Sequence, residues 1–118
     1  MFESLDELVA EYDDVVQQLY DPAVIADLSR LRDVSRRHHE LEPVVDAYRA
    51  YRNTNTDLEL AQEMLAGAEG ADRELLAEEI TAAEKRRAAL EEELKLLLLI
   101  FLLERVDSRL SFHYIQYL

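Results

Sequence analysis

Glycine and proline, which interrupt helices and form turns, are nearly absent from this chain of 118 residues. It contains two of each, whereas Ala, Leu, Glu and Arg, which favour helices, are abundant. A β-sandwich or barrel needs frequent turns, and those turns depend on glycine and proline. The sequence therefore predicts an all-α fold built from long helices.

The composition fits one small domain. Hydrophobic residues make up 49% of the chain, too many for a disordered polyelectrolyte, and the length leaves no room for a second core. Acidic residues outnumber basic ones by 26 to 13, and the resulting net charge of -13 repels a nucleic-acid backbone. The absence of cysteine excludes disulfides and thiolate metal sites, and the opening Met-Phe-Glu is unlike a signal peptide. We therefore expect a cytoplasmic protein without a membrane span.

Apolar spacing and capping residues predict the first helices. Ser4 begins a capping box, and the apolar residues after it recur at helical intervals through Leu19. Asp21 and Pro22 suit the N-cap and the first position of a second helix, so the chain turns there. That second helix carries its own apolar stripe, formed by Ile25, Leu28, Leu31, Val34, Leu41, Val44, Val45, Tyr48 and Tyr51.

Two later segments disfavour an uninterrupted helix. Pro43 lacks a backbone donor and crowds the preceding turn, which predicts a kink near residues 41–43 rather than a complete break. Residues 53–57, Asn-Thr-Asn-Thr-Asp, are weak helix formers and predict fraying or a short interruption. The helical spacing resumes at Leu58.

Both glycines lie within residues 67–72, which predicts a second chain reversal with Asp72 as a candidate cap. From Arg73 to Leu94 the composition is that of a coiled-coil strand, with few acid–base pairs at favourable spacing. Such a helix needs a packing partner, most simply the preceding helix folded back against it. The predicted architecture is an antiparallel helical hairpin with the first helix alongside, a three-helix coiled-coil-like bundle.

Charge is distributed unevenly between the first two helical segments. Residues 1–27 hold eight carboxylates and no base, whereas residues 28–56 hold six arginines and four acids. If the segments pack antiparallel, some arginines face the acidic helix; alternatively, the two charged faces are solvated independently. The arginines concerned are Arg30, Arg32, Arg36 and Arg37.

No residue pattern typical of an enzyme is present. His38 and His39 point about 100 degrees apart on a helix, and His38 with Glu42 supplies only two metal ligands. The serines lie outside any triad pattern, and adjacent carboxylates lie on highly charged helices where solvation is ordinary. We assign no catalytic, cofactor-binding or metal-binding residue, and expect no cofactor and no enzymatic activity.

Aromatic and basic residues are interleaved near the middle of the chain. Tyr48, Arg49, Tyr51 and Arg52 match the composition of an RNA-contact patch. The tyrosines also continue the apolar stripe of the second helix, so core packing of the tyrosines and solvation of the arginines are favoured. No direct nucleic-acid motif is predicted.

Four segments carry a resemblance to a known family. They are the opening Met-Phe-Glu-Ser-Leu, His-Glu-Leu-Glu-Pro-Val-Val at residues 39–45 followed by Tyr48 and Tyr51, Glu-Leu-Leu-Ala-Glu-Glu at residues 74–79, and Leu-Glu-Glu-Glu-Leu-Lys-Leu-Leu-Leu at residues 90–98. Over residues 1–98 the chain resembles the N-terminal domain of bacterial class I peptide chain release factors, most closely the factor 1 branch of an actinobacterial type.

The resemblance implies a helical domain that precedes codon-reading and catalytic domains and contacts the ribosome near the base of the large-subunit stalk. The family hydrolyses peptidyl-tRNA through a Gly-Gly-Gln motif, in response to UAA and UAG in the factor 1 branch. This chain contains neither Gly-Gly-Gln nor the codon-reading tripeptides Pro-x-Thr and Ser-Pro-Phe. We therefore expect it neither to read a codon nor to release a peptide by itself.

Residues 99–118 depart from the family, which would continue with a Pro-x-Asp-Pro turn into its next domain. We expect this apolar C-terminal tail to be foreign to the family, through truncation or a change of reading frame. The eight consecutive apolar residues 96–103 fall short of the roughly 20 that a membrane-spanning helix needs. Burial between helices or homo-oligomerisation is favoured over membrane attachment. A free-standing, self-associating helical module is thus the alternative to a ribosome-contacting domain.

Overall fold

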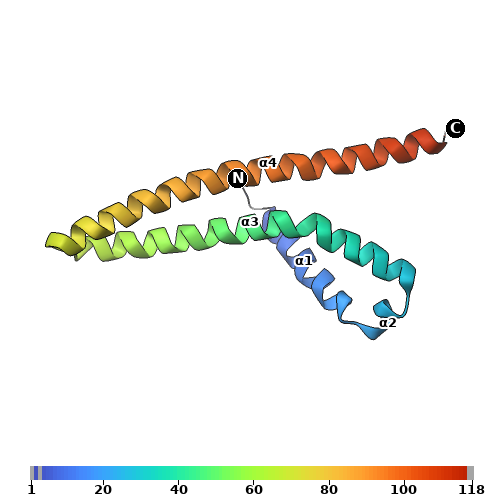
Figure 1. The fold of residues 1–118 in the computed structure, drawn as a ribbon, viewed down its shortest axis with the longest axis horizontal. Coiled ribbons are helices and arrows are strands. Elements are labelled where there is room, and N and C mark those ends of the chain that lie inside the picture. The colour runs from blue at the N-terminus through green and yellow to red at the C-terminus, as the bar shows by residue number, and fades with distance from the viewer. Residues whose placement is uncertain (1, 3, 117–118) are drawn as a thin grey trace. The chain divides into compact units, whose positions relative to one another are not determined.

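The computed structural model describes residue 2 and residues 4–116, with side chains through residue 104, and its regular structure there is entirely helical. The helices are α1 (Leu5–Leu19), α2 (Pro22–Ile25), α3 (Leu28–Ala66) and α4 (Gly70–Gln116), as Figure 1 shows. The all-α prediction is confirmed. The chain divides into a first unit, residues 1–46 with 95–118, and a second unit, residues 47–94, so α3 and α4 contribute to both.

The apolar stripe predicted for the first helix is confirmed in α1, where Leu5 and Val15 are buried. The capping box predicted at Ser4 is not formed, because the Ser4 side chain makes no capping hydrogen bond. Its backbone has helical angles, φ -68 and ψ -14, rather than the extended conformation that aims a capping side chain at the free amides. Asp6 and Glu7 in the first turn still complement the helix dipole.

The capping predicted at Asp21 is confirmed. The Asp21 backbone is extended, its Oδ1 accepts a 2.9 Å hydrogen bond from the backbone amide of Ala23, and Pro22 occupies the start of α2. Val24 is the fully buried side chain of this four-residue helix. The turn after α1 is thus built by local hydrogen bonding and fixed in place by one apolar anchor.

The sequence suggested that the helix begun at Pro22 continues into the long helix, but the structure has two separate helices, α2 and α3. Asp27 precedes the start of α3 and caps it, because its Oδ1 accepts a 3.2 Å hydrogen bond from the backbone amide of Arg30. Ile25 and Leu28 beside this break are 50% and 68% exposed, so their assignment to the apolar stripe was wrong. An aspartate immediately before an apolar residue is an N-cap signal that the periodicity concealed.

Pro43 does not break the helix completely, in line with the sequence analysis, since α3 continues through it. Proline inside a helix costs about 3 kcal/mol or more. Around Pro43, however, Leu41, Val44 and Val45 are all at most 2% exposed. Burying three such side chains contributes about 1.5 to 3 kcal/mol each, which outweighs the proline.

The interruption predicted at residues 53–57 is wrong, because α3 is helical throughout. Thr54 Oγ1 donates to the Ala50 carbonyl at 2.9 Å, so its hydroxyl is satisfied inside the helix although the residue is buried. Leu58, one turn later, is 3% exposed. Weak intrinsic propensity is overridden here by tertiary burial on the same helical face.

The reversal predicted at the glycines is confirmed, because α3 ends at Ala66 and α4 begins at Gly70. Gly70 has φ +62, a left-handed conformation that favours glycine. Asp72 is not the cap; it lies within the first turn of α4, where its negative charge complements the helix dipole.

The second unit is an antiparallel helical hairpin, as predicted. Its apolar cluster consists of Leu58 on α3 with Ile80 and Ala83 on α4, and Ala61 and Leu65 pack against it. Each helix supplies one stripe to the shared seam. The helix beginning at residue 70 therefore has the packing partner that its weak surface pairing required.

Candidate interaction surfaces

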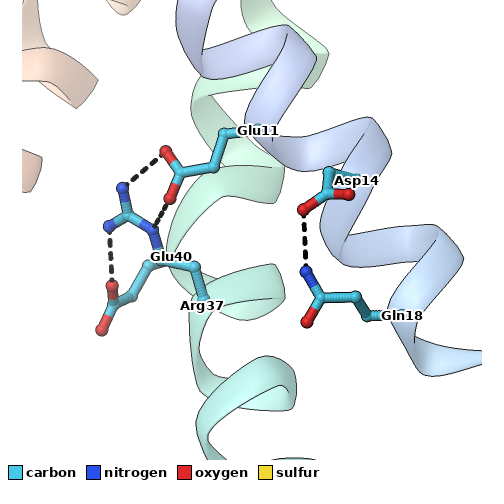
Figure 2. Close-up of polar contacts among 5 residues, drawn as sticks. All are labelled: Glu11, Asp14, Gln18, Arg37 and Glu40. Carbon is cyan, nitrogen blue, oxygen red and sulfur yellow. Dashed lines mark hydrogen bonds and ion pairs between the residues drawn. The ribbon is translucent and has the colours of Figure 1, made fainter. Parts of the chain in front are cut away.

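Arg37 joins α1 to α3 in the first unit. Its Nε donates to Glu11 Oε1 at 2.5 Å and its Nη2 to Glu11 Oε2 at 2.8 Å, while its Nη1 donates to Glu40 Oε2 at 3.3 Å (Figure 2). Nearby along the two helices, Tyr12 stacks on His38 with ring centroids 5.1 Å apart. A bidentate guanidinium–carboxylate pair fixes orientation as well as distance, so it sets the register of α1 on α3.

The prediction that arginines face the acidic first helix is thus confirmed for Arg37. Arg30, Arg32 and Arg36 are exposed, as expected for independently solvated side chains. Position explains the difference, because Arg37 lies on the partly buried face of α3 and the other three do not.

Arg37 also contacts α4 within the same unit. Its guanidinium carbon lies 5.4 Å from the ring centroid of Phe101, which is 6% exposed. The hydrogen bond to Glu11 raises the pKa of Arg37; partial burial opposes this, and Glu40 adds to it. Arg37 therefore stays charged and connects α1, α3 and α4 through directional contacts.

A small cavity lies between α3 and α4 in the first unit. Its volume of about 160 Å³ is below the roughly 300 to 1,000 Å³ of ordinary small-molecule sites. It therefore offers no pocket for a cofactor. The lining residues are His39, Glu40, Pro43, Val44, Leu97, Ile100, Phe101 and Glu104.

Next to this cavity α4 presents an exposed apolar surface, which we call the outer leucine face. The interhelix burial predicted for residues 96–103 holds for Phe101, whereas the residues of this face are 43% to 57% exposed. Side chains of residues 105–118 in the predicted tail lie outside the described part of the chain. The outer leucine face consists of Leu96, Leu99, Ile100, Leu102 and Leu103.

A wider depression, which we call the tip groove, lies at the hairpin end of the second unit. Its volume is about 610 Å³, and its apolar side chains include Met64 and Leu75, which are 55% and 57% exposed. Carboxylates border these apolar groups. The groove is lined by Glu63, Met64, Gly67, Ala68, Asp72, Leu75, Leu76 and Glu79.

The structure also locates the side chains considered for chemistry. His38 Nδ1 lies 3.3 Å from Glu42 Oε2, and over the described residues no group of three or more metal-ligating side chains occurs. Tyr48 is buried, as core packing predicted, and Arg52 lies 5.6 Å from its ring centroid. Within the described part of the chain, no helix is long and apolar enough to cross a membrane.

Comparison with known proteins relates both units to one family. The PCRF domain matches residues 8–102. The chain is 39% identical over 99 residues to peptide chain release factor 1 from Oleidesulfovibrio alaskensis, and 40% identical over 98 residues to that from Streptomyces avermitilis. The respective alignments cover 84% and 83% of this chain.

The same alignments cover 28% and 26% of the relatives, so the chain spans about a quarter of the length of the curated relatives it matches. No solved structure matches the chain. The matched residues include the Arg37 contacts, the reversal and the tip groove. The resemblance to class I release factors is therefore confirmed, and the chain belongs to the PCRF domain family.

Proposed function

We propose that this chain acts in translation termination as the helical, ribosome-contacting domain of a peptide chain release factor. The supporting observation is the PCRF domain match over residues 8–102, together with relatives named peptide chain release factor 1. A complete factor of this kind acts in the cytoplasm at UAA and UAG codons. Following the resemblance, this domain contacts the large subunit near the base of its stalk.

Codon reading and peptide release belong, in this proposal, to other parts of a release factor. This chain contains no Gly-Gly-Gln and neither codon-reading tripeptide, so alone it binds ribosomes without releasing peptide. Residues 1–98 form the family domain and residues 99–118 an apolar tail. The start of this tail packs on the domain, since Phe101 contacts Arg37. The family match itself extends to residue 102, so the boundary expected at residue 98 falls four residues short of it.

Co-sedimentation of the purified chain with ribosomes over a salt series tests this function. We expect saturable binding, retained by the Leu99→Glu/Leu103→Glu variant because the outer leucine face is not the ribosome contact proposed. We also expect no peptide release from stalled termination complexes. A chain with intact helical circular dichroism that stays in the supernatant at every salt concentration contradicts the proposal.

The outer leucine face favours a second candidate function, self-association as a helical interaction module. Five large apolar side chains at 43% to 57% exposure form a patch of the kind that marks protein interfaces. Sedimentation equilibrium tests it: the wild-type chain forms a dimer that Leu99→Glu/Leu103→Glu dissociates. A wild-type chain that stays monomeric over the whole concentration range rules this candidate out.

A further inference from the structure

We propose that the tip groove is a docking site for a positively charged protein segment that inserts an apolar side chain. This inference rests on the proposed ribosome association and deepens it, because it names the surface that binds and the chemistry of the partner. The partner is protein rather than RNA. Three observations carry the inference: the apolar floor of the groove, its acidic border, and the hydrogen bond made by Arg73, the single basic residue of this stretch, to a backbone carbonyl.

The apolar floor is not needed to hold the hairpin together. The hairpin's own seam uses Leu58, Ile80 and Ala83, which are at most 9% exposed. Met64 and Leu75 lie one on each helix and remain more than half exposed. Their exposure is retained although burying either would be favourable, which is expected of a surface that a partner covers.

The backbone leaves room for an inserted side chain. Gly67 lines the groove, and a Cβ built on it meets no other atom within 4 Å. The groove volume of about 610 Å³ accommodates a large apolar side chain together with part of the segment that carries it. This arrangement suits a partner helix that lays its apolar face into a groove.

The charge around the floor selects the partner. Glu63, Asp72 and Glu79 border it, and residues 57–79 contain eight carboxylates against a single base, Arg73. Arg73 Nη1 donates to the Leu65 carbonyl at 3.1 Å, so this cation is directed to the end of α3. The remaining field is negative, which repels a phosphate backbone and attracts lysine and arginine side chains.

Site-directed cross-linking identifies what the groove touches. The natural chain has no cysteine, so Met64→Cys provides one attachment point for a benzophenone maleimide, and Glu84→Cys provides a matched point on the same unit outside the groove. After irradiation with ribosomes, we expect the Met64→Cys probe to yield a product that survives ribonuclease and is destroyed by protease. A ribonuclease-sensitive product, or equal cross-linking from both positions, overturns the proposal.

Charge reversal gives a second, independent test with the full-length chain. Glu63→Lys/Glu79→Lys changes the border, whereas Glu59→Lys/Glu84→Lys changes net charge equally outside the groove. We expect ribosome affinity to fall about tenfold or more for the first pair, as for loss of a central interface contact, and to change little for the second. Equal affinities for both pairs overturn the groove assignment while leaving ribosome binding intact. If the unaltered chain fails to bind ribosomes, the proposed function and the groove assignment fall together.

Discussion

Different kinds of contact stabilise each of the two units internally. In the first unit, Arg37 makes directional contacts with Glu11, Glu40 and Phe101, and thereby joins segments far apart in the sequence. In the second, two helices connected by a short reversal share a small seam around Leu58 and Ile80. Assembling distant segments requires contacts that specify orientation, whereas a hairpin needs one apolar stripe per helix. Because the hairpin is stabilised by this small seam, apolar side chains such as Met64 and Leu75 stay exposed and available for binding.

Truncation of a buried leucine tests this comparison with the largest expected effect. Leu41 in the first unit is 0% exposed, so Leu41→Ala should lower the free energy of unfolding by about 3 to 5 kcal/mol. Leu58→Ala in the smaller seam should cost about 2 to 3 kcal/mol. Urea denaturation followed by circular dichroism measures both. A larger loss for Leu58→Ala would mean that the hairpin seam is the stronger of the two.

Replacing Arg37 tests the directional contacts. Arg37→Met should cost about 1 to 2 kcal/mol, because charged hydrogen bonds to a partly exposed partner are lost. Arg36→Met, at the exposed neighbouring position, should change stability by less than about 0.5 kcal/mol. A double-mutant cycle of Arg37→Met with Glu11→Gln isolates the pair, and a coupling energy near zero would contradict its role.

The pH dependence of this contact has a definite sign. The pKa of Arg37 is raised in the folded state. The contribution of Arg37 to the free energy of unfolding is therefore complete at lower pH and is lost only as pH rises through that raised value. Arginine is protonated at all ordinary pH values. The difference in unfolding free energy between wild type and Arg37→Met should therefore stay constant from neutral to mildly alkaline pH in urea titrations.

The glycines at the reversal sharpen the account of the hairpin. Gly70→Ala should cost about 1 to 2 kcal/mol, because its φ of +62 strains a residue with a Cβ. Gly67→Ala is the matched control: its backbone is not left-handed and a Cβ there meets open space, so stability should be unchanged or rise by up to about 1 kcal/mol. Equal losses in thermal melts would show that the reversal does not depend on the Gly70 conformation.

Capping residues give the smallest expected effects. Asp21→Ala should cost about 0.5 to 1 kcal/mol because it removes the hydrogen bond to the Ala23 amide. Ser4→Ala should be nearly neutral, because Ser4 makes no capping hydrogen bond. Denaturation of the two variants side by side distinguishes a formed cap from one suggested only by spacing. A measurable loss for Ser4→Ala would contradict the observed geometry.

Apolar spacing predicted much of the fold because helix packing follows it directly. The stripe predicted for the second helix includes Leu41, Val44, Val45 and Tyr48, which are at most 8% exposed. The prediction of an interruption at residues 53–57 failed because local propensity competes there with burial, whereas the helix continues through Pro43 without the complete break that the sequence also disfavoured. Pro43 and the segment at 53–57 stay helical because neighbouring side chains on the same helix are buried, and no single-position preference contains that information.

The interaction surfaces were harder to predict because they depend on which side chain meets which. The sequence placed four arginines opposite an acidic helix, but choosing Arg37 required the orientation of α3. Phe101 was assigned to the apolar tail, although it is buried against Arg37. One feature of the sequence could have predicted the tip groove: Met64 and Leu75 flank the glycine pair within a strongly acidic stretch.

Hydrogen exchange of the chain, free and bound to ribosomes, tests the central claim most directly. It follows both units in one experiment, with the first unit as an internal reference. We predict slower exchange on binding at the backbone amides of residues 63–79, including the reversal at 67–69, and unchanged exchange in α1 and around Arg37. Exchange that is identical in the free and ribosome-containing samples, or protection confined to the first unit, would contradict the account.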